Sequence, residues 1–201
     1  MAYQVVISDL GGVVVEFNAD HIVHQMAQLV GRSFDEVQQA VYDKELLLPF
    51  ELGRVSPQAY YEGLTQRLKL PWTFEQFARA WNNIFIENRD VTGMLERLRK
   101  RHTLVALSNT NALHIEYIKQ SFPALACFSH WIASCDVGFR KPDPQIYQLA
   151  LQRAGVRASE AIYIDDRPEL VEAGRAVGLT AIRFESGPQL EQDLRAAGLN
   201  M

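Results

Sequence analysis

The stretch that decides the fold is Val5-Val6-Ile7-Ser8-Asp9-Leu10-Gly11-Gly12-Val13-Val14. A short apolar run that ends at a carboxylate and two glycines is typical of a buried strand followed by a sharp turn. Such a strand places Asp9 at one end of a sheet, and the glycines let the backbone turn beside it. A charge in this place needs a cation or hydrogen bonds to compensate it. Asp9 is therefore either a turn-capping residue or part of a binding site.

Composition narrows the class of protein. The chain has 201 residues with a formal net charge of -4, and 48% of them are hydrophobic, which is ordinary for a globular protein. The negative charge argues against nucleic acid or an anionic membrane surface as the main partner. Cys127 and Cys135 are too few for a disulfide scaffold or a cysteine-rich zinc site. Without a membrane-length apolar run or a basic N-terminal leader, the sequence predicts a soluble cytoplasmic protein.

A helical region follows the first strand. Residues 20–88 show helical periodicity and no convincing strand. Ser33–Glu36 and Thr73–Gln76 are capping boxes, and the first is expected to open a helix that runs toward Leu48. Ser56-Pro57 opens another helix. The helix after the second capping box is expected to carry one apolar face, formed by Phe77, Trp81, Ile84 and Phe85.

From Asp90 onward, strands alternate with helices. Four more apolar runs predict strands, at Leu104–Leu107, Trp131–Ser134, Ala161–Ile164 and Thr180–Phe184. This alternation is typical of parallel βαβ units with right-handed crossovers. We therefore expect an α/β fold with a five-stranded parallel sheet and a helical bundle inserted after its first strand.

Polar residues stand at three of the expected strand ends, as Asp9, Ser108-Asn109 and Asp165-Asp166. In open parallel sheets, ligands bind at the carboxyl ends of the strands, so these residues are expected to face one crevice. Three carboxylates in one pocket repel one another unless a cation is present. Because the ligand atoms are all oxygen, the pattern predicts Mg²⁺.

Two further features suit a phosphate group. Ser108 supplies a hydroxyl, and the start of the following helix supplies N–H donors, although Ser108-Asn109 would also cap that helix. Lys141 is followed by two prolines that restrict its position, in Lys141-Pro142-Asp143-Pro144. A carboxylate nucleophile, a divalent cation, N–H donors and a lysine together indicate phosphoryl transfer through an aspartyl-phosphate. In this hypothesis Asp9 attacks phosphorus, while Mg²⁺ and Lys141 neutralise the equatorial oxygens.

Four motifs resemble those of the haloacid dehalogenase (HAD) superfamily of hydrolases and stand in the family's order: Asp9–Val13, Leu107–Asn109, Arg140–Pro144 and Ile164–Asp166. Two segments, Ser108–Asn111 with His114 and Glu51–Ser56, resemble the subgroup of bacterial sugar-phosphate phosphatases that includes α-glucose-1-phosphate phosphatase. The resemblance implies a HAD-like Rossmannoid three-layer core formed by residues 1–16 and 89–201. It also implies a helical C1 cap domain formed by residues 17–88.

The resemblance also implies roles for individual residues. Asp9 would be the nucleophile and a metal ligand, and Gly11 would offer the metal its backbone carbonyl. Asp165 and Asp166 would complete or orient the metal site, and one of them would hold Lys141. Ser108 and Lys141 would assist catalysis. The implied substrate is a small phosphorylated metabolite such as a sugar phosphate, and the residues expected to bind its phosphate are Ser108, Asn109, Lys141 and Gly12.

Gly11 departs from the family pattern, because HAD phosphatases usually carry an aspartate there as general acid and base. Loss of such a group costs about 10²–10⁴-fold in rate. Glu16, Glu51 and His24 are the candidate replacements. The absence of an aspartate at Gly11 leaves two alternatives to a phosphatase open. One is a 2-haloacid dehalogenase, which also lacks this aspartate. The other is a non-catalytic regulator that binds a phospho-ligand.

Overall fold

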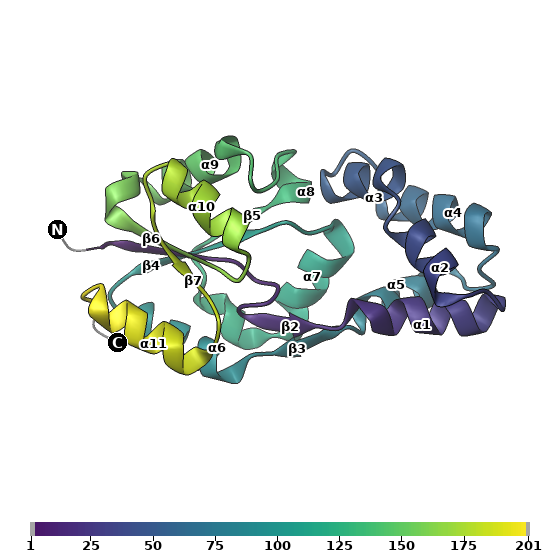
Figure 1. Cartoon of the computed structure of the whole chain (residues 1–201), viewed down its shortest axis with the longest axis horizontal. Coiled ribbons are helices and arrows are strands. Elements are labelled where there is room, and N and C mark those ends of the chain that lie inside the picture. Colours follow the sequence, from purple (N-terminus) through teal and green to yellow (C-terminus); the bar gives the residue numbers. More distant parts are fainter. Residues whose placement is uncertain (1–2, 200–201) are drawn as a thin grey trace.

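A five-stranded parallel sheet organises the chain, with strand order β5-β4-β1-β6-β7. The computed structural model describes residues 3–199 and shows this sheet at one end of the molecule (Figure 1). The expected α/β fold is confirmed. The strands are β1 (Val5–Ser8), β4 (Thr103–Ser108), β5 (His130–Ala133), β6 (Ala161–Asp165) and β7 (Thr180–Arg183).

Helices cover both faces of the sheet and make three layers (Figure 1). Alternate side chains of a strand point to opposite faces, so Val6 joins one buried apolar cluster while Val5 and Ile7 join the other. The first cluster is covered by α6 (Arg89–Leu98), α7 (Ala112–Ser121) and α11 (Gly187–Ala196). The second is covered by α9 (Pro144–Ala154) and α10 (Pro168–Ala176).

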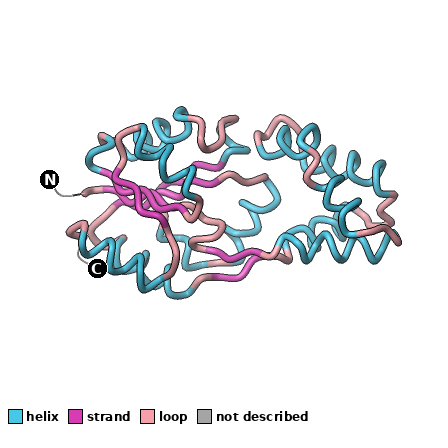
Figure 2. The backbone as a smooth tube through the Cα atoms, viewed as in Figure 1, coloured by secondary structure: helices cyan, strands magenta, loops and turns pink. Residues whose placement is uncertain are grey.

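Five further helices, which we call the insert helices, lie at the other end of the molecule (Figures 1 and 2). They have an apolar cluster of their own that includes Phe50, Tyr60 and Trp81, so these aromatic residues are core residues of the insert helices. The helices are α1 (Ala19–Val30), α2 (Phe34–Val41), α3 (Lys44–Glu51), α4 (Pro57–Leu68) and α5 (Phe74–Asn82).

A two-stranded antiparallel ribbon joins the two groups, formed by β2 (Val15–Phe17) and β3 (Phe85–Glu87). The expectation that residues 20–88 hold no strand was therefore wrong, and neither Ile84 nor Phe85 belongs to the helix that carries Phe77 and Trp81. The reason is that α5 ends at Asn82, and the backbone of Phe85 then pairs with Phe17. Apolar periodicity alone does not distinguish the end of a helix from a short strand that continues it.

The single helix expected from Ser33 toward Leu48 is divided into α2 and α3. Asp43 causes the division, because its side chain caps a new helix by accepting hydrogen bonds from the N–H groups of Glu45 (3.0 Å) and Leu46 (3.2 Å). α3 then brings Glu51 toward α8 (Ser134–Val137), a short helix after β5. Among residues 3–199, no helix combines the length and apolar character needed to cross a membrane.

Candidate active site

Asp9 follows β1 and is held in a tight turn. The residue is 7% exposed, and its Oδ1 accepts a hydrogen bond from the N–H of Leu10 at 2.7 Å. The carbonyl of Leu10 in turn accepts the N–H groups of Val14 and Val15. Gly12 adopts a φ of 81° in this turn, and its N–H donates to the carbonyl of Val15 at 2.9 Å. The turn therefore fixes the Asp9 side chain at the carboxyl end of the sheet.

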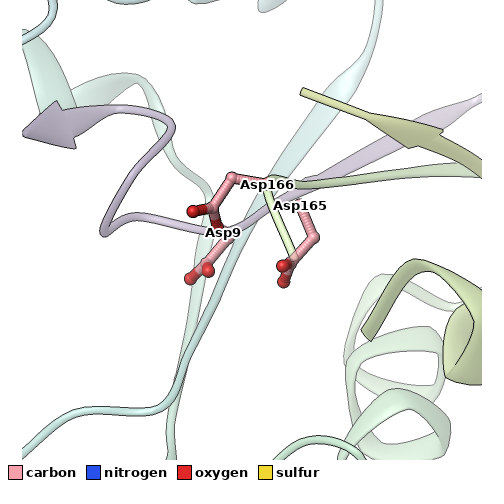
Figure 3. A group of neighbouring side chains, drawn as sticks. All are labelled: Asp9, Asp165 and Asp166. Atoms are coloured by element: carbon pink, nitrogen blue, oxygen red, sulfur yellow. The ribbon is translucent and has the colours of Figure 1, made fainter. Parts of the chain in front are cut away.

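The three carboxylates expected to meet do lie together. One oxygen from each of Asp9, Asp165 and Asp166 lies within 4.8 Å of the others, and Figure 3 shows the side chains side by side. They meet because β1 pairs directly with β6 in parallel register, with Ser8 opposite Ile164. The residues that follow these positions leave the sheet at the same edge.

Lys141 is buried, with 1% exposure, between two of these carboxylates. Its Nζ lies 3.0 Å from Asp9 Oδ2 and 2.6 Å from Asp165 Oδ2. The Asn109 side chain makes two hydrogen bonds to the Lys141 backbone. Asn109 Nδ2 donates to the carbonyl of Lys141 at 2.9 Å, and Asn109 Oδ1 accepts the N–H of Lys141 at 2.8 Å. The Asn109 side chain thus positions the lysine.

Asp165 and Asp166 are neighbours with different surroundings. Asp165 is fully buried and accepts hydrogen bonds from Lys141, from the Tyr163 hydroxyl and from the Arg167 N–H (3.0 Å). Asp166 is half-buried, and its carboxylate lies so close to Gly12 that a Cβ there would be 2.5 Å from Oδ2. Gly12 is therefore required by space as well as by its positive φ.

The electrostatics of the cluster suit a divalent cation. Burial and the charge of Asp165 raise the pKa of Asp9 to about 7, against the opposing effect of Lys141. Burial, together with Asp165, also raises the pKa of Asp166. Ionising these two carboxyl groups is costly in this place, and a bound cation would remove that cost. Because the donor atoms are all oxygen, the group fits Mg²⁺. Gly11 lies in the turn that follows Asp9, and its backbone forms an isolated bridge with Val15.

Ser108 ends β4 and is 5% exposed. It does not cap the helix that follows: the N-cap of α7 is Asn111, whose Oδ1 accepts the N–H of His114 at 3.1 Å. Ser108 and Asn109 instead line a cavity of about 190 Å³ between the sheet and the insert helices, together with Leu10 and Gly11. The cavity therefore begins at the strand ends that carry the polar residues.

The three candidate replacements for the missing aspartate lie in different places. Glu16 is exposed on β2, and His24 is exposed on α1 with its Nδ1 2.9 Å from the carbonyl of Asp20. Glu51 lines the cavity, and its carboxylate forms an ion pair with Arg140 at 2.6 Å. Burial raises the pKa of Glu51, while Arg140 and Arg167 oppose the rise.

The sequence analysis missed Ser134, which links the insert helices to the sheet. Its buried hydroxyl lies 2.7 Å from the carbonyl of Glu51 and accepts the N–H of Thr110 at 2.9 Å. Gly53 approaches the same segment, and a Cβ on it would be 1.9 Å from the carbonyl oxygen of Cys135. A lone serine and a lone glycine carry no signal of such contacts in a sequence.

Residues 3–178 match the family described as haloacid dehalogenase-like hydrolase. The chain belongs to this family. A relative with full-length similarity is D-ribitol-5-phosphate phosphatase from Bacteroides thetaiotaomicron, which is 24% identical over 197 residues, covering 94% of this chain and 95% of the relative. Phosphoserine phosphatase from Thermus thermophilus is 28% identical over 188 residues, covering 86% of this chain and 74% of the relative. This chain, like other members of the family, is a hydrolase.

Solved structures of the HAD family share the fold. A HAD family enzyme from Bacteroides thetaiotaomicron superposes with a TM-score of 0.87 at 21% identity, over 97% of this chain and 100% of the other. A structure of that enzyme in complex with magnesium and inorganic phosphate superposes with a TM-score of 0.83 at 21% identity, over 92% of this chain and 96% of the other.

Proposed function

We propose that this hydrolase is a Mg²⁺-dependent phosphatase that releases phosphate from a small phosphorylated metabolite. The observation that carries the proposal is the contact of Lys141 with Asp9 beside two further carboxylates. Relatives whose names identify them as phosphatases of ribitol 5-phosphate and phosphoserine support it, as does the relative crystallised with magnesium and phosphate.

Each residue has a distinct role in the proposed site. Asp9 and Asp166, with the carbonyl of Gly11, would hold Mg²⁺, which supplies positive charge to screen the carboxylates from an anionic ester. Asp165 has its oxygens occupied by hydrogen bonds from the protein, so we assign it to positioning Lys141. Lys141 and Ser108 would contact the phosphate oxygens, with Asn109 positioning the lysine. The N–H of Gly12 is bonded to Val15, so its phosphate-binding role stays a prediction.

The proposed reaction has two steps. An oxygen of Asp9 forms a bond to phosphorus as the ester P–O bond breaks, and the leaving alkoxide takes a proton. Water then attacks the aspartyl-phosphate, which releases inorganic phosphate and restores the carboxylate. Glu51 is the proposed donor of the first proton, since it lines the cavity. We also propose that residues 17–88 act as a cap over the site, which excludes water from the first step.

The test is phosphate release from a panel of phosphate monoesters, with Mg²⁺ and with EDTA. We expect turnover with Mg²⁺ and none with EDTA. Asp9→Asn should lower kcat about 10⁴-fold or more, because the nucleophile is lost. Asp35→Asn, an exposed change in the first turn of α2, is the control and should retain full activity.

Three outcomes would contradict the proposal. Turnover that survives Asp9→Asn would show that Asp9 is not the nucleophile. Chloride release from a 2-chloro acid in EDTA would favour dehalogenation instead. Esters that bind with Mg²⁺ but are never hydrolysed would favour a phospho-ligand regulator.

A further inference from the structure

The cavity beside the proposed site has an apolar far wall. Toward the insert helices it is lined by apolar side chains, among them Ile22, Leu47, Trp81, Ile84 and Phe85, while Phe17 lies against Gly11 beside the strand ends. Ile22, Trp81 and Ile84 are at most 8% exposed, so this wall is formed by well-packed side chains. A group bound there exchanges water for carbon contacts.

Several polar groups of the wall already have protein partners. The Asn111 amide donates to Nδ1 of His114 at 3.0 Å and accepts the His114 N–H through Oδ1. The remaining ring nitrogen, Nε2, then carries the proton and donates to the carbonyl of Trp81 at 3.2 Å. Burial lowers the pKa of His114 to about 4, which keeps the ring neutral. Glu51 is paired with Arg140.

Few polar groups remain for the hydroxyls of a polyol. Ser108 and Thr110 lie at the end of β4, next to the proposed phosphate position, and Tyr42 is 41% exposed to solvent. On the far wall, Trp81 Nε1 has no partner among residues 3–199, but the atom is buried and is not accessible to a hydroxyl in the cavity. A polyol placed there would lose hydrogen bonds to water without replacing them, which is costly.

The volume limits the size of the bound group. A cavity of about 190 Å³ equals roughly six times the ~30 Å³ that one water occupies in the liquid. An organic group of roughly five to eight carbon atoms fills such a space.

We propose that the preferred substrates are phosphate monoesters of small apolar alcohols, with a branched alkyl, prenyl or aryl group, rather than phosphorylated sugars or polyols. This inference rests on the proposed phosphatase function. The phosphate lies against Lys141 and Ser108, and the apolar group fills the cavity toward Leu47 and Trp81. The reaction is the one given above, with the apolar alcohol as leaving group.

The first arm of the test compares esters of primary alcohols with Mg²⁺ present. In the series ethyl, propyl, butyl and pentyl phosphate, kcat/KM should rise about three- to fourfold per methylene until the cavity is full. Pentyl phosphate should exceed ribitol 5-phosphate, which has the same number of carbons, by about 100-fold or more. A flat alkyl series, or a preference for ribitol 5-phosphate, would overturn the inference and leave the phosphatase function standing.

The second arm uses paired variants of α3. Leu47→Asn places an amide on the cavity wall and should lower kcat/KM for pentyl phosphate about tenfold, with little change for ethyl phosphate. Leu48→Asn is the matched control, because Leu48 is the next residue, is 36% exposed and does not line the cavity. Equal effects of the two variants on the alkyl series would contradict the placement of the apolar group.

The third arm separates this inference from the proposed function. Binding of pentylphosphonate and of 2,3-dihydroxypropylphosphonate, neither of which has an ester bond to cleave, is measured by calorimetry with Mg²⁺. Pentylphosphonate should bind at least tenfold more tightly. Equal or weaker binding of pentylphosphonate overturns the inference whatever the turnover. Tighter binding without hydrolysis of any ester would support the placement of the apolar group in the cavity and overturn the proposed function.

Discussion

The strand ends and the far wall of the cavity face one another, and they are built on different principles. At the strand ends, Lys141 contacts both Asp9 and Asp165 over distances of 2.6–3.0 Å, and all three groups are buried. On the far wall, the side chains are mostly apolar, and polar groups such as His114 are neutral and paired.

This contrast indicates that the two regions have different roles. Charged groups in a buried cluster depend on one another, so a change to one of them alters the chemistry and the stability of the others. Apolar groups act through area and shape, and a change to one of them alters how well a ligand fits.

The largest effects are expected where two adjacent carboxylates should behave differently. Asp165→Asn removes a buried partner of Lys141 and should lower the free energy of unfolding by about 3 kcal/mol. Asp166→Asn affects a half-buried group and should change stability by less than about 1 kcal/mol. It should instead raise the Mg²⁺ concentration for half-maximal activity at least about tenfold.

Urea denaturation and a Mg²⁺ titration of phosphate release measure these two effects. The assignment of the two residues is wrong if the variants lose stability equally. It is also wrong if Asp165→Asn alone raises the Mg²⁺ concentration for half-maximal activity and leaves stability unchanged.

A pH titration tests whether the wall is uncharged. The folded pKa of His114, about 4, lies below the unfolded value of 6.5. The unfolded state therefore binds more protons between these values, and the stability from a neutral His114 is lost as pH falls from 6.5 toward 4. His114→Gln retains a donor without a titrating ring. The stability of the wild type relative to this variant should fall by up to about 3 kcal/mol over that range.

Chemical denaturation at several pH values between 7 and 4 makes this comparison. Superimposable pH dependences for the wild type and His114→Gln would show that the ring titrates in the folded protein as it does in the unfolded chain, so that it is charged below about pH 6.5. The far wall would then hold a positive charge close to the apolar group.

Glu51 belongs to both regions, since it lines the cavity and pairs with Arg140. Glu51→Gln should lower kcat about 100-fold for alkyl phosphates, whose alkoxide needs a proton, and much less for p-nitrophenyl phosphate. Glu16→Gln and His24→Asn are controls at exposed positions and should leave kcat and its pH profile unchanged. Equal losses for both classes of ester would assign Glu51 to structure and not to proton transfer.

The smallest effect concerns the contact between the two regions. Gly53 and Gly31 have φ of 67° and 66°, so alanine is strained at both, by about 1 kcal/mol. At Gly53 the Cβ also meets the carbonyl of Cys135, whereas at Gly31 nothing lies within 4 Å. Gly53→Ala should therefore displace α3 from α8 and lower kcat/KM about tenfold. Gly31→Ala should reduce stability alone. Steady-state kinetics and thermal unfolding of both variants test this, and identical kinetics would show that the contact does not position Glu51.

Much of the sheet and its polar residues was predictable, because the signals are local. An apolar run ending at Asp9, another ending at Ser108 and a third ending at Asp165 each read as a strand in the sequence. Parallel strands bring such ends to one edge whatever the details of packing, so the meeting of the carboxylates followed from the topology. The ribbon was not predictable, because the three residues of β3 continue the apolar pattern of α5.

By itself the sequence determined the order of strands and helices, the family and the residue types at the strand ends. The tertiary structure alone decided that Asp165, and not Asp166, bonds Lys141, that Asn109 holds the lysine backbone, and that Glu51 reaches the cavity. It also decided which apolar side chains line a cavity and which fill a core. The physical reason is that side chains lining a cavity and side chains filling a core produce the same apolar periodicity in the sequence. The space between side chains depends instead on segments that lie far apart in the chain.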